Sequence, residues 1–200
     1  MLQRQTKFFL VIGVLFVLVI VLWVAEYAKP ADPTQQVYED DRADLGNPKA
    51  TIVITNYFDF YCSHCKEADK SLGRILDQYS DRVLIKYRYF PITQPSVMAA
   101  VAAECAGTQG KFLPYHNLLF SRFSGTAFTA ETLRQLASTA GLDGEQFQEC
   151  LDSQQTAPAV YYDLRLATGR GIVAVPTIFV NDVEVEAENL VAEVERLLAQ

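Results

Sequence analysis

The chain has 200 residues, and half of them are hydrophobic, which suffices for one domain with a core plus an appendage. Its formal charge is −7, and every aspartate and glutamate lies after residue 25. An acidic surface repels phosphate backbones, so we expect no nucleic acid among its partners.

An apolar run near the N-terminus, residues 8–25, contains no charge and no proline. It is long for a signal-peptide core and just long enough to span a bilayer, which takes ~20 residues of helix. Arg4 and Lys7 precede it and acidic residues follow, so the chain beyond it should lie outside the cytoplasm. We predict a cytoplasmic N-terminus (1–7) and a single-pass transmembrane signal-anchor in the cell membrane. The C-terminal domain is then extracytoplasmic, on the periplasmic or cell-surface side.

Two questions about this N-terminal region are whether the apolar run is cleaved off and where the folded domain begins. A cleaved signal peptide is the alternative interpretation. Cleavage after Ala25 or Ala28 is disfavoured, because Trp23 and Glu26 lie two residues before these positions, where signal peptides have a small residue. Residues 26–47 are polar, include two prolines and show no apolar periodicity, which is typical of a linker. The folded domain is therefore predicted to cover residues 48–200.

The domain begins with a strand–helix–strand pattern. Residues 51–58 are β-branched and aromatic, as in a strand covered on both faces. Residues 65–79 have helical periodicity, and residues 82–90 form a second strand ended by Pro91. A connection this long predicts a parallel pair with a right-handed crossover.

A block of helices separates this first half from a second β-containing half. The expected insertion covers about residues 95–168, with helices at 96–109, 112–123, 129–140, 143–151 and 158–168. Residues 177–180 then form a strand, which turns at Asn181 and Asp182 into an antiparallel return over 183–185. An amphipathic helix over 188–199 closes the chain.

Cys62 and Cys65 lie two residues apart, where the first strand gives way to the first helix. A sulfur at a helix N-terminus faces unpaired N–H groups, which lower its pKa and favour the reactive thiolate. His64, between the two cysteines, can add positive charge or a donor toward Cys62. A stabilised Cys62 thiolate makes the disulfide a stronger oxidant, and Cys65 is positioned to resolve a mixed disulfide at Cys62.

The other uses of this cysteine pair are a structural disulfide and a zinc site. Zinc needs a second pair of ligands, and the two remaining cysteines, Cys105 and Cys150, are far apart in sequence, so we expect no metal. The four cysteines allow three pairings, of which Cys62 with Cys65 is the natural local one. That pairing leaves Cys105 with Cys150.

Val175 and Pro176 precede the apolar strand at 177–180. Proline cannot donate a hydrogen bond to a sheet, and a cis peptide bond here would expose the Val175 backbone to an extended peptide. By itself this is weak evidence for a substrate-binding loop.

Three segments together resemble the DsbA-like thiol–disulfide oxidoreductases. They are FDFYCSHCK at residues 58–66, the stretch from Glu104 to His116, and VPTIFVN at 175–181. The resemblance covers residues 44–200. It implies an α/β thioredoxin-like fold with an inserted α-helical domain, here preceded by an N-terminal transmembrane helix. It also implies Cys62 as the exposed nucleophile, Cys65 as its buried partner, and Val175–Pro176 as a cis-proline loop facing them.

Details around the motif favour the oxidant members of the family. The histidine before the second cysteine and the valine before the proline are similar to DsbA. Ser63 replaces the proline usual in DsbA, and Asn181-Asp182 replaces the usual Asn-Gly turn. The resemblance also permits a structural Cys105–Cys150 disulfide; two buried free thiols or a second redox pair are the alternatives.

From these observations we expect an enzyme that introduces disulfides into exported proteins without a dissociable cofactor. Its partners are then reduced or unfolded exported proteins and, by resemblance, a quinone-linked membrane protein that reoxidises the monomeric enzyme. Two other functions stay open. One is a thiol–disulfide reductase or donor, for instance in cytochrome c maturation, and the other is a non-catalytic peptide-binding chaperone module.

Overall fold

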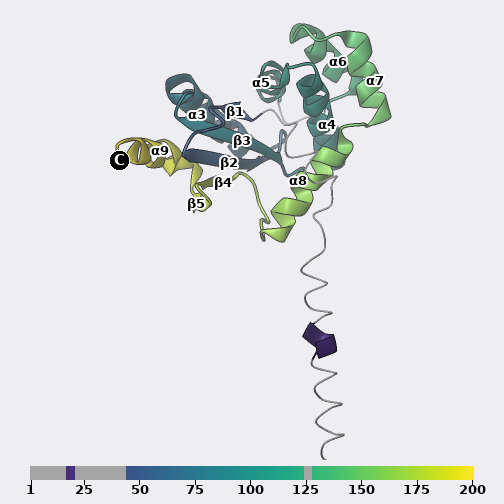
Figure 1. Cartoon of the computed structure of the whole chain (residues 1–200). Coiled ribbons are helices and arrows are strands. Elements are labelled where there is room, and N and C mark those ends of the chain that lie inside the picture. The colour runs from purple at the N-terminus through teal and green to yellow at the C-terminus, as the bar shows by residue number, and fades with distance from the viewer. Residues whose placement is uncertain (1–16, 21–43, 124–127) are drawn as a thin grey trace, which may run out of the picture. The chain divides into compact units, whose positions relative to one another are not determined.

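The computed structural model describes residues 17–20, 44–123 and 128–200 (Figure 1). The predicted anchor and linker therefore lie mostly outside the described residues. Among those that are described, no helix combines the length and the apolar character needed to cross a membrane. The elements discussed below belong to the compact unit formed by residues 41–200.

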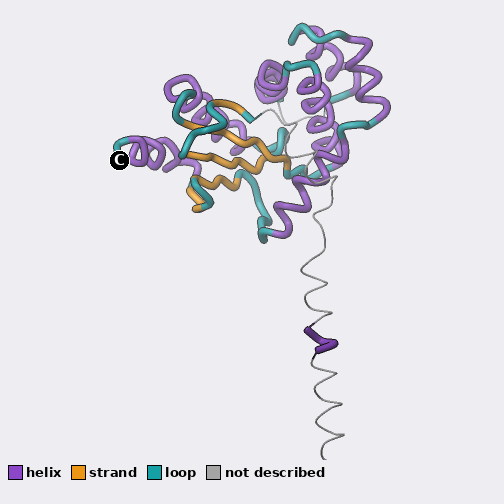
Figure 2. The backbone as a smooth tube through the Cα atoms, viewed as in Figure 1, coloured by secondary structure: helices purple, strands orange, loops and turns teal. Residues whose placement is uncertain are grey.

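Along the sequence, the strands of this unit fall in its first and last parts, and the part between them is helical. In space the strands gather into one sheet, with the helices around it (Figure 2). Their order is β1 (Leu45–Gly46), β2 (Ile52–Phe58), α3 (Ser63–Tyr79), β3 (Val83–Tyr89), α4 (Gln94–Thr108), α5 (Phe112–Arg122), α6 (Ala130–Thr139), α7 (Gly144–Ser153), α8 (Ala157–Gly169), β4 (Thr177–Val180), β5 (Val183–Val185), η1 (Ala187–Asn189) and α9 (Leu190–Leu198).

The strands form one sheet in the order β1-β3-β2-β4-β5. β2 and β3 pair in parallel, as the strand–helix–strand order predicts, with Ile54 opposite Ile85. β4 runs antiparallel to β2 on its other side and returns through β5. The central strand β2 therefore ends between two neighbours, and the chain that follows it carries Cys62.

Helices cover both faces of this sheet. Ile54 and Phe58 of β2 point into the main hydrophobic core, which also contains Leu72 of α3. Tyr57, between them, points to the other face, where it packs with Ala167 of α8. Alternate residues of β2 are thus buried on opposite sides, which explains the apolar character of the strand.

The inserted helices α4–α7 pack together beside the sheet, and α8 leads the chain back to β4 (Figure 1). Helix α4 is rich in alanine and is buried on most of its surface, so its neighbours approach closely. Cys105 of α4 and Cys150 of α7 form a disulfide in this block.

Three local features differ from the sequence expectations or refine them. The predicted linker reaches residue 47, but Leu45 and Gly46 form β1, which pairs antiparallel with β3. Gly46 has φ +99°, and a Cβ there would clash with the Val83 backbone oxygen, so only glycine fits. Helix α3 begins at Ser63, two residues earlier than predicted.

The predicted turn at Asn181 and Asp182 is present, and both residues have positive φ, of 49° and 64°. Asparagine and aspartate tolerate this left-handed conformation better than most residues, so the tight hairpin forms without glycine.

Candidate active site

Cys62 is the N-cap of helix α3. Its backbone is extended, and its sulfur accepts a hydrogen bond from the backbone N–H of Cys65, at 3.2 Å. The sulfur thereby takes the place that a serine or aspartate oxygen commonly occupies at a helix start. Cys62 is half-buried whereas Cys65 is fully buried, and both are free thiols in this structure.

The two thiols have opposite pKa shifts. The Cys65 thiol, hydrogen-bonded to the Cys62 sulfur, is the largest cause that lowers the pKa of Cys62, from 9.0 to about 6. Backbone N–H groups of Cys65 and His64 lower this pKa further, while partial burial opposes them. The hydrogen bond to Cys62, followed by burial, raises the pKa of Cys65 far above the ordinary thiol range. At neutral pH the pair therefore holds one thiolate, on Cys62, and one thiol.

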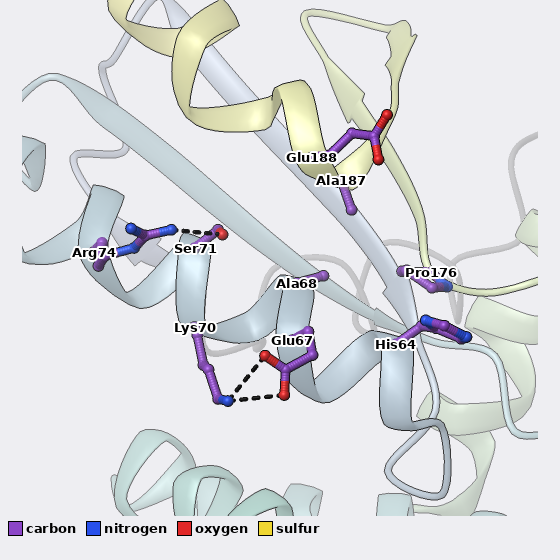
Figure 3. Close-up of a pocket in the computed structure, with 9 residues that line it drawn as sticks. All are labelled: His64, Glu67, Ala68, Lys70, Ser71, Arg74, Pro176, Ala187 and Glu188. Carbon is purple, nitrogen blue, oxygen red and sulfur yellow. Dashed lines mark hydrogen bonds and ion pairs between the residues drawn. The ribbon is translucent and has the colours of Figure 1, made fainter.

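The expectation for His64 was a positive charge or a donor toward Cys62. The contribution of His64 to the lowered pKa of Cys62 comes from its backbone N–H, which is a donor. The His64 side chain is exposed and lies beside Pro176 (Figure 3).

The loop before β4 meets the N-terminus of α3. The Val175–Pro176 peptide bond is cis, and the Cys62 thiol donates to the Val175 carbonyl oxygen at 3.6 Å. The fold thus brings together the Cys62–Cys65 motif and the Val175–Pro176 segment.

A groove of about 640 Å³ extends from this junction along α3 (Figure 3). His64 and Pro176 line it next to the reactive pair, Arg74 lines it further along α3, and η1 forms the facing wall. The volume is in the range of ligand sites, and the groove is open to solvent.

An aromatic cluster of Tyr61, Phe123 and Phe128 flanks Cys62 on the side of the helical insertion. The Tyr61 ring centroid lies 5.1 Å from that of Phe123 and 5.4 Å from that of Phe128. The Tyr61 hydroxyl accepts from the Phe128 N–H at 2.6 Å, and Lys66 donates to the Phe123 carbonyl oxygen at 3.5 Å. The three aromatic residues are only partly buried, so they offer apolar surface beside the nucleophile.

His116 is fully buried. Its Nε2 lies 2.8 Å from Asp69 Oδ1, which also accepts from the Tyr87 hydroxyl at 3.2 Å. The carboxylate can only accept, so Nε2 carries the proton. This pair links α5 of the insertion to α3, one turn beyond Cys65.

The other two cysteines are outside the site. Cys105 and Cys150 are joined, with their Cα atoms 5.8 Å apart, and both are buried. Among the described residues, no cluster of histidine, cysteine and acidic side chains has the arrangement of a metal site.

Sequence reasoning missed how deeply Asp59 is buried. It is 3 % exposed, and its carboxylate accepts three hydrogen bonds. An aspartate between two aromatic residues, directly after a buried strand, is the signal that could have indicated burial.

Known proteins resemble this chain in sequence and in fold. The thioredoxin family profile matches residues 39–200. A Rickettsia typhi protein, provisionally named a protein-disulfide oxidoreductase, is 28 % identical over 185 residues, which are 86 % of this chain and 68 % of the relative. A thioredoxin-like oxidoreductase from Silicibacter pomeroyi has a TM-score of 0.70 at 27 % identity, covering 85 % of this chain and 99 % of that one.

The thiol–disulfide exchange protein α-DsbA2 of Wolbachia pipientis has the same fold, with a TM-score of 0.69 at 16 % identity over 84 % of this chain and all of that one. The chain therefore belongs to the thioredoxin family. Within that family it is a DsbA-like thiol–disulfide oxidoreductase.

Proposed function

We propose that this enzyme introduces disulfides into exported proteins through the Cys62–Cys65 pair. The observation that carries the proposal is the asymmetry of the pair. Cys62 is accessible and has a lowered pKa, whereas Cys65 is buried and stays protonated. A sulfur that leaves readily as a thiolate favours the reduced form of the pair, so the disulfide form accepts electrons from other thiols.

The exchange has two steps. A substrate thiolate attacks the Cys62 sulfur of the disulfide, the Cys62–Cys65 bond breaks, and Cys65 leaves and takes a proton. A second substrate thiolate then attacks the substrate sulfur bound to Cys62, and Cys62 leaves as a thiolate. Two electrons pass from the substrate to the pair; of the two substrate protons, one ends on Cys65 and one goes to solvent.

Substrate binding is proposed at the Val175–Pro176 loop. The backbone of Val175 lies beside the Cys62 sulfur, where an extended peptide can pair with it. The groove along α3 and the aromatic cluster beside Tyr61 then contact the residues that flank the substrate cysteine.

The cellular setting is also a proposal and is supported by sequence alone. Residues 1–7 are taken as cytoplasmic, 8–25 as a membrane anchor and 26–47 as the linker to an extracytoplasmic, monomeric domain. A quinone-linked membrane protein is the proposed reoxidant. Intact mass of the mature chain tests the anchor, because cleavage near residue 25 would remove it.

Refolding of a reduced, unfolded protein that contains disulfides tests the activity. The oxidised full chain should accelerate the appearance of native substrate, and Cys62→Ser should abolish that acceleration. A Cys105→Ala/Cys150→Ala double variant, assayed under conditions in which it stays folded, is the control and should retain it. Equal acceleration by Cys62→Ser would show a chaperone effect and would overturn the redox proposal.

A further inference from the structure

Asp59 connects the active-site turn to a second part of the fold. Its Oδ1 accepts from the Tyr61 N–H at 2.7 Å, next to Cys62. Its Oδ2 accepts from the Ile92 N–H at 2.9 Å, in the connection between β3 and α4, and from the Ser96 hydroxyl at 2.8 Å, in the first turn of α4. The Asp59 backbone oxygen also accepts from the Cys62 N–H at 3.1 Å, so this residue stabilises the turn that contains Cys62.

The charge of this carboxylate is not cancelled by a cation. Within the part of the chain that the structure describes, no lysine, arginine or histidine forms an ion pair with Asp59. Its three donors are neutral, so they stabilise the carboxylate and leave its net charge in place. A buried, unpaired charge acts strongly on its surroundings because little water screens it.

Three neighbouring groups respond to that charge. The Asp59 carboxylate raises the pKa of Tyr61, of Cys62 and of Cys65, although it is the largest cause at none of them. Its field therefore reaches both sulfurs, and at Cys62 it opposes the hydrogen bonds that favour the thiolate.

We propose that Asp59 is a positioning residue that also limits the oxidising power of the Cys62–Cys65 pair. When a substrate dithiol reduces the disulfide, two electrons enter the pair, Cys65 gains a proton and Cys62 becomes a thiolate. The disulfide form has no charge on either sulfur, so Asp59 repels only the reduced form. Its carboxylate thus shifts the equilibrium toward the disulfide and weakens an otherwise stronger oxidant.

Replacing the charge while keeping the turn tests this inference. Asp59→Asn is isosteric, and Asp59→Ser is a second neutral variant whose hydroxyl can still accept from the Tyr61 N–H. Each is equilibrated with glutathione, and Cys62 is titrated by thiolate absorbance. We expect the equilibrium to move about threefold to tenfold toward the dithiol, because the carboxylate is the smallest of the causes that act on the pKa of Cys62. The Cys62 midpoint should move to lower pH in parallel.

Two control variants separate charge from structure. Asp77→Asn makes the same chemical change on an exposed turn of α3 and should leave both readouts unchanged. Asp59→Glu keeps the charge and should stay closer to the parent chain than either neutral variant.

A purely structural role predicts another pattern. The neutral variants would then lose thermal stability equally in both redox forms, while the glutathione equilibrium and the Cys62 midpoint stayed within twofold of the parent values. That result would overturn the inference. Both readouts measure the Cys62–Cys65 pair of the purified protein. Their outcome therefore does not depend on whether the enzyme oxidises substrates in the cell.

Discussion

The sulfur of Cys62 lies 3.6 Å from the backbone oxygen of Val175, across 113 residues of sequence. In the reduced, protonated state the thiol donates a hydrogen bond to this oxygen. A thiolate cannot donate, so ionisation of Cys62 releases the Val175 carbonyl to accept from a peptide N–H. Ionisation of Cys62 and release of the proposed substrate-binding carbonyl of Val175 are therefore coupled at one contact.

The pKa shifts predict a pH-dependent stability of the reduced enzyme. The folded pKa of Cys62, about 6, is below its ordinary 9.0, so its thiolate stabilises the reduced fold fully above 9.0. That contribution is lost as the pH falls through 6. The raised pKa of Cys65 acts in the opposite sense, but only as the pH rises above 9.0.

Thermal unfolding of both redox forms measures this effect. Because the oxidised form has neither thiol, the Tm of the reduced form minus that of the oxidised form should increase from about pH 5 to about pH 8. A difference that is flat across this range, or that decreases, would contradict the assignment of the thiolate to Cys62.

Substitutions at Cys65 should separate the hydrogen bond from the helix end. Cys65→Ala removes the donor that is the largest cause of the lowered Cys62 pKa, so the Cys62 midpoint should rise above 6. Cys65→Ser keeps a hydroxyl donor at the same place and should raise it less. Thiolate absorbance titration of the two variants provides the comparison, and equal midpoints in both would mean that the backbone N–H groups dominate.

The Cys105–Cys150 disulfide should contribute to stability and not to exchange. It closes a loop of 45 residues, for which the chain-entropy relation gives about 4 kcal/mol. Denaturant unfolding of the Cys105→Ala/Cys150→Ala variant should show a loss of about 2–4 kcal/mol, with thiol exchange retained when folded. Loss of exchange in a folded variant would instead identify a second redox-active pair.

The contact of Asp69 with His116 and Tyr87 should hold the helical insertion to α3. Asp69→Ala leaves two buried donors without their acceptor, at a cost of about 2–4 kcal/mol in the free energy of unfolding. Asp69→Asn retains one acceptor oxygen and should cost less. Urea unfolding of the two variants tests this; equal losses would show that the negative charge matters more than the acceptor.

Much of the site could be predicted because its signals are local. The β-branched run before Cys62 and the helical periodicity after it place the cysteine pair at the junction of β2 and α3. That position by itself implies a helix-end sulfur, which the N-cap geometry of Cys62 bears out. The hairpin at Asn181 and Asp182 was predictable for the same reason.

The remaining contacts depend on residues far apart in sequence. Asp59 is held by Ile92 and Ser96, 33 and 37 positions later, and no periodic pattern indicates such a contact. Likewise, the two-residue strand β1 is too short to produce an alternation of apolar and polar residues. It forms because Gly46 allows the chain to approach β3 closely.

The equilibrium of the Cys62–Cys65 pair with glutathione decides whether the enzyme is an oxidant. A thiolate stabilised to a pKa of about 6 favours the dithiol, so the potential should be more positive than that of thioredoxin, about −270 mV, and nearer to −200 mV or above. With this value the full chain, once oxidised, transfers its disulfide to reduced substrates. A potential at or below about −270 mV would contradict the proposed direction and identify a reductase.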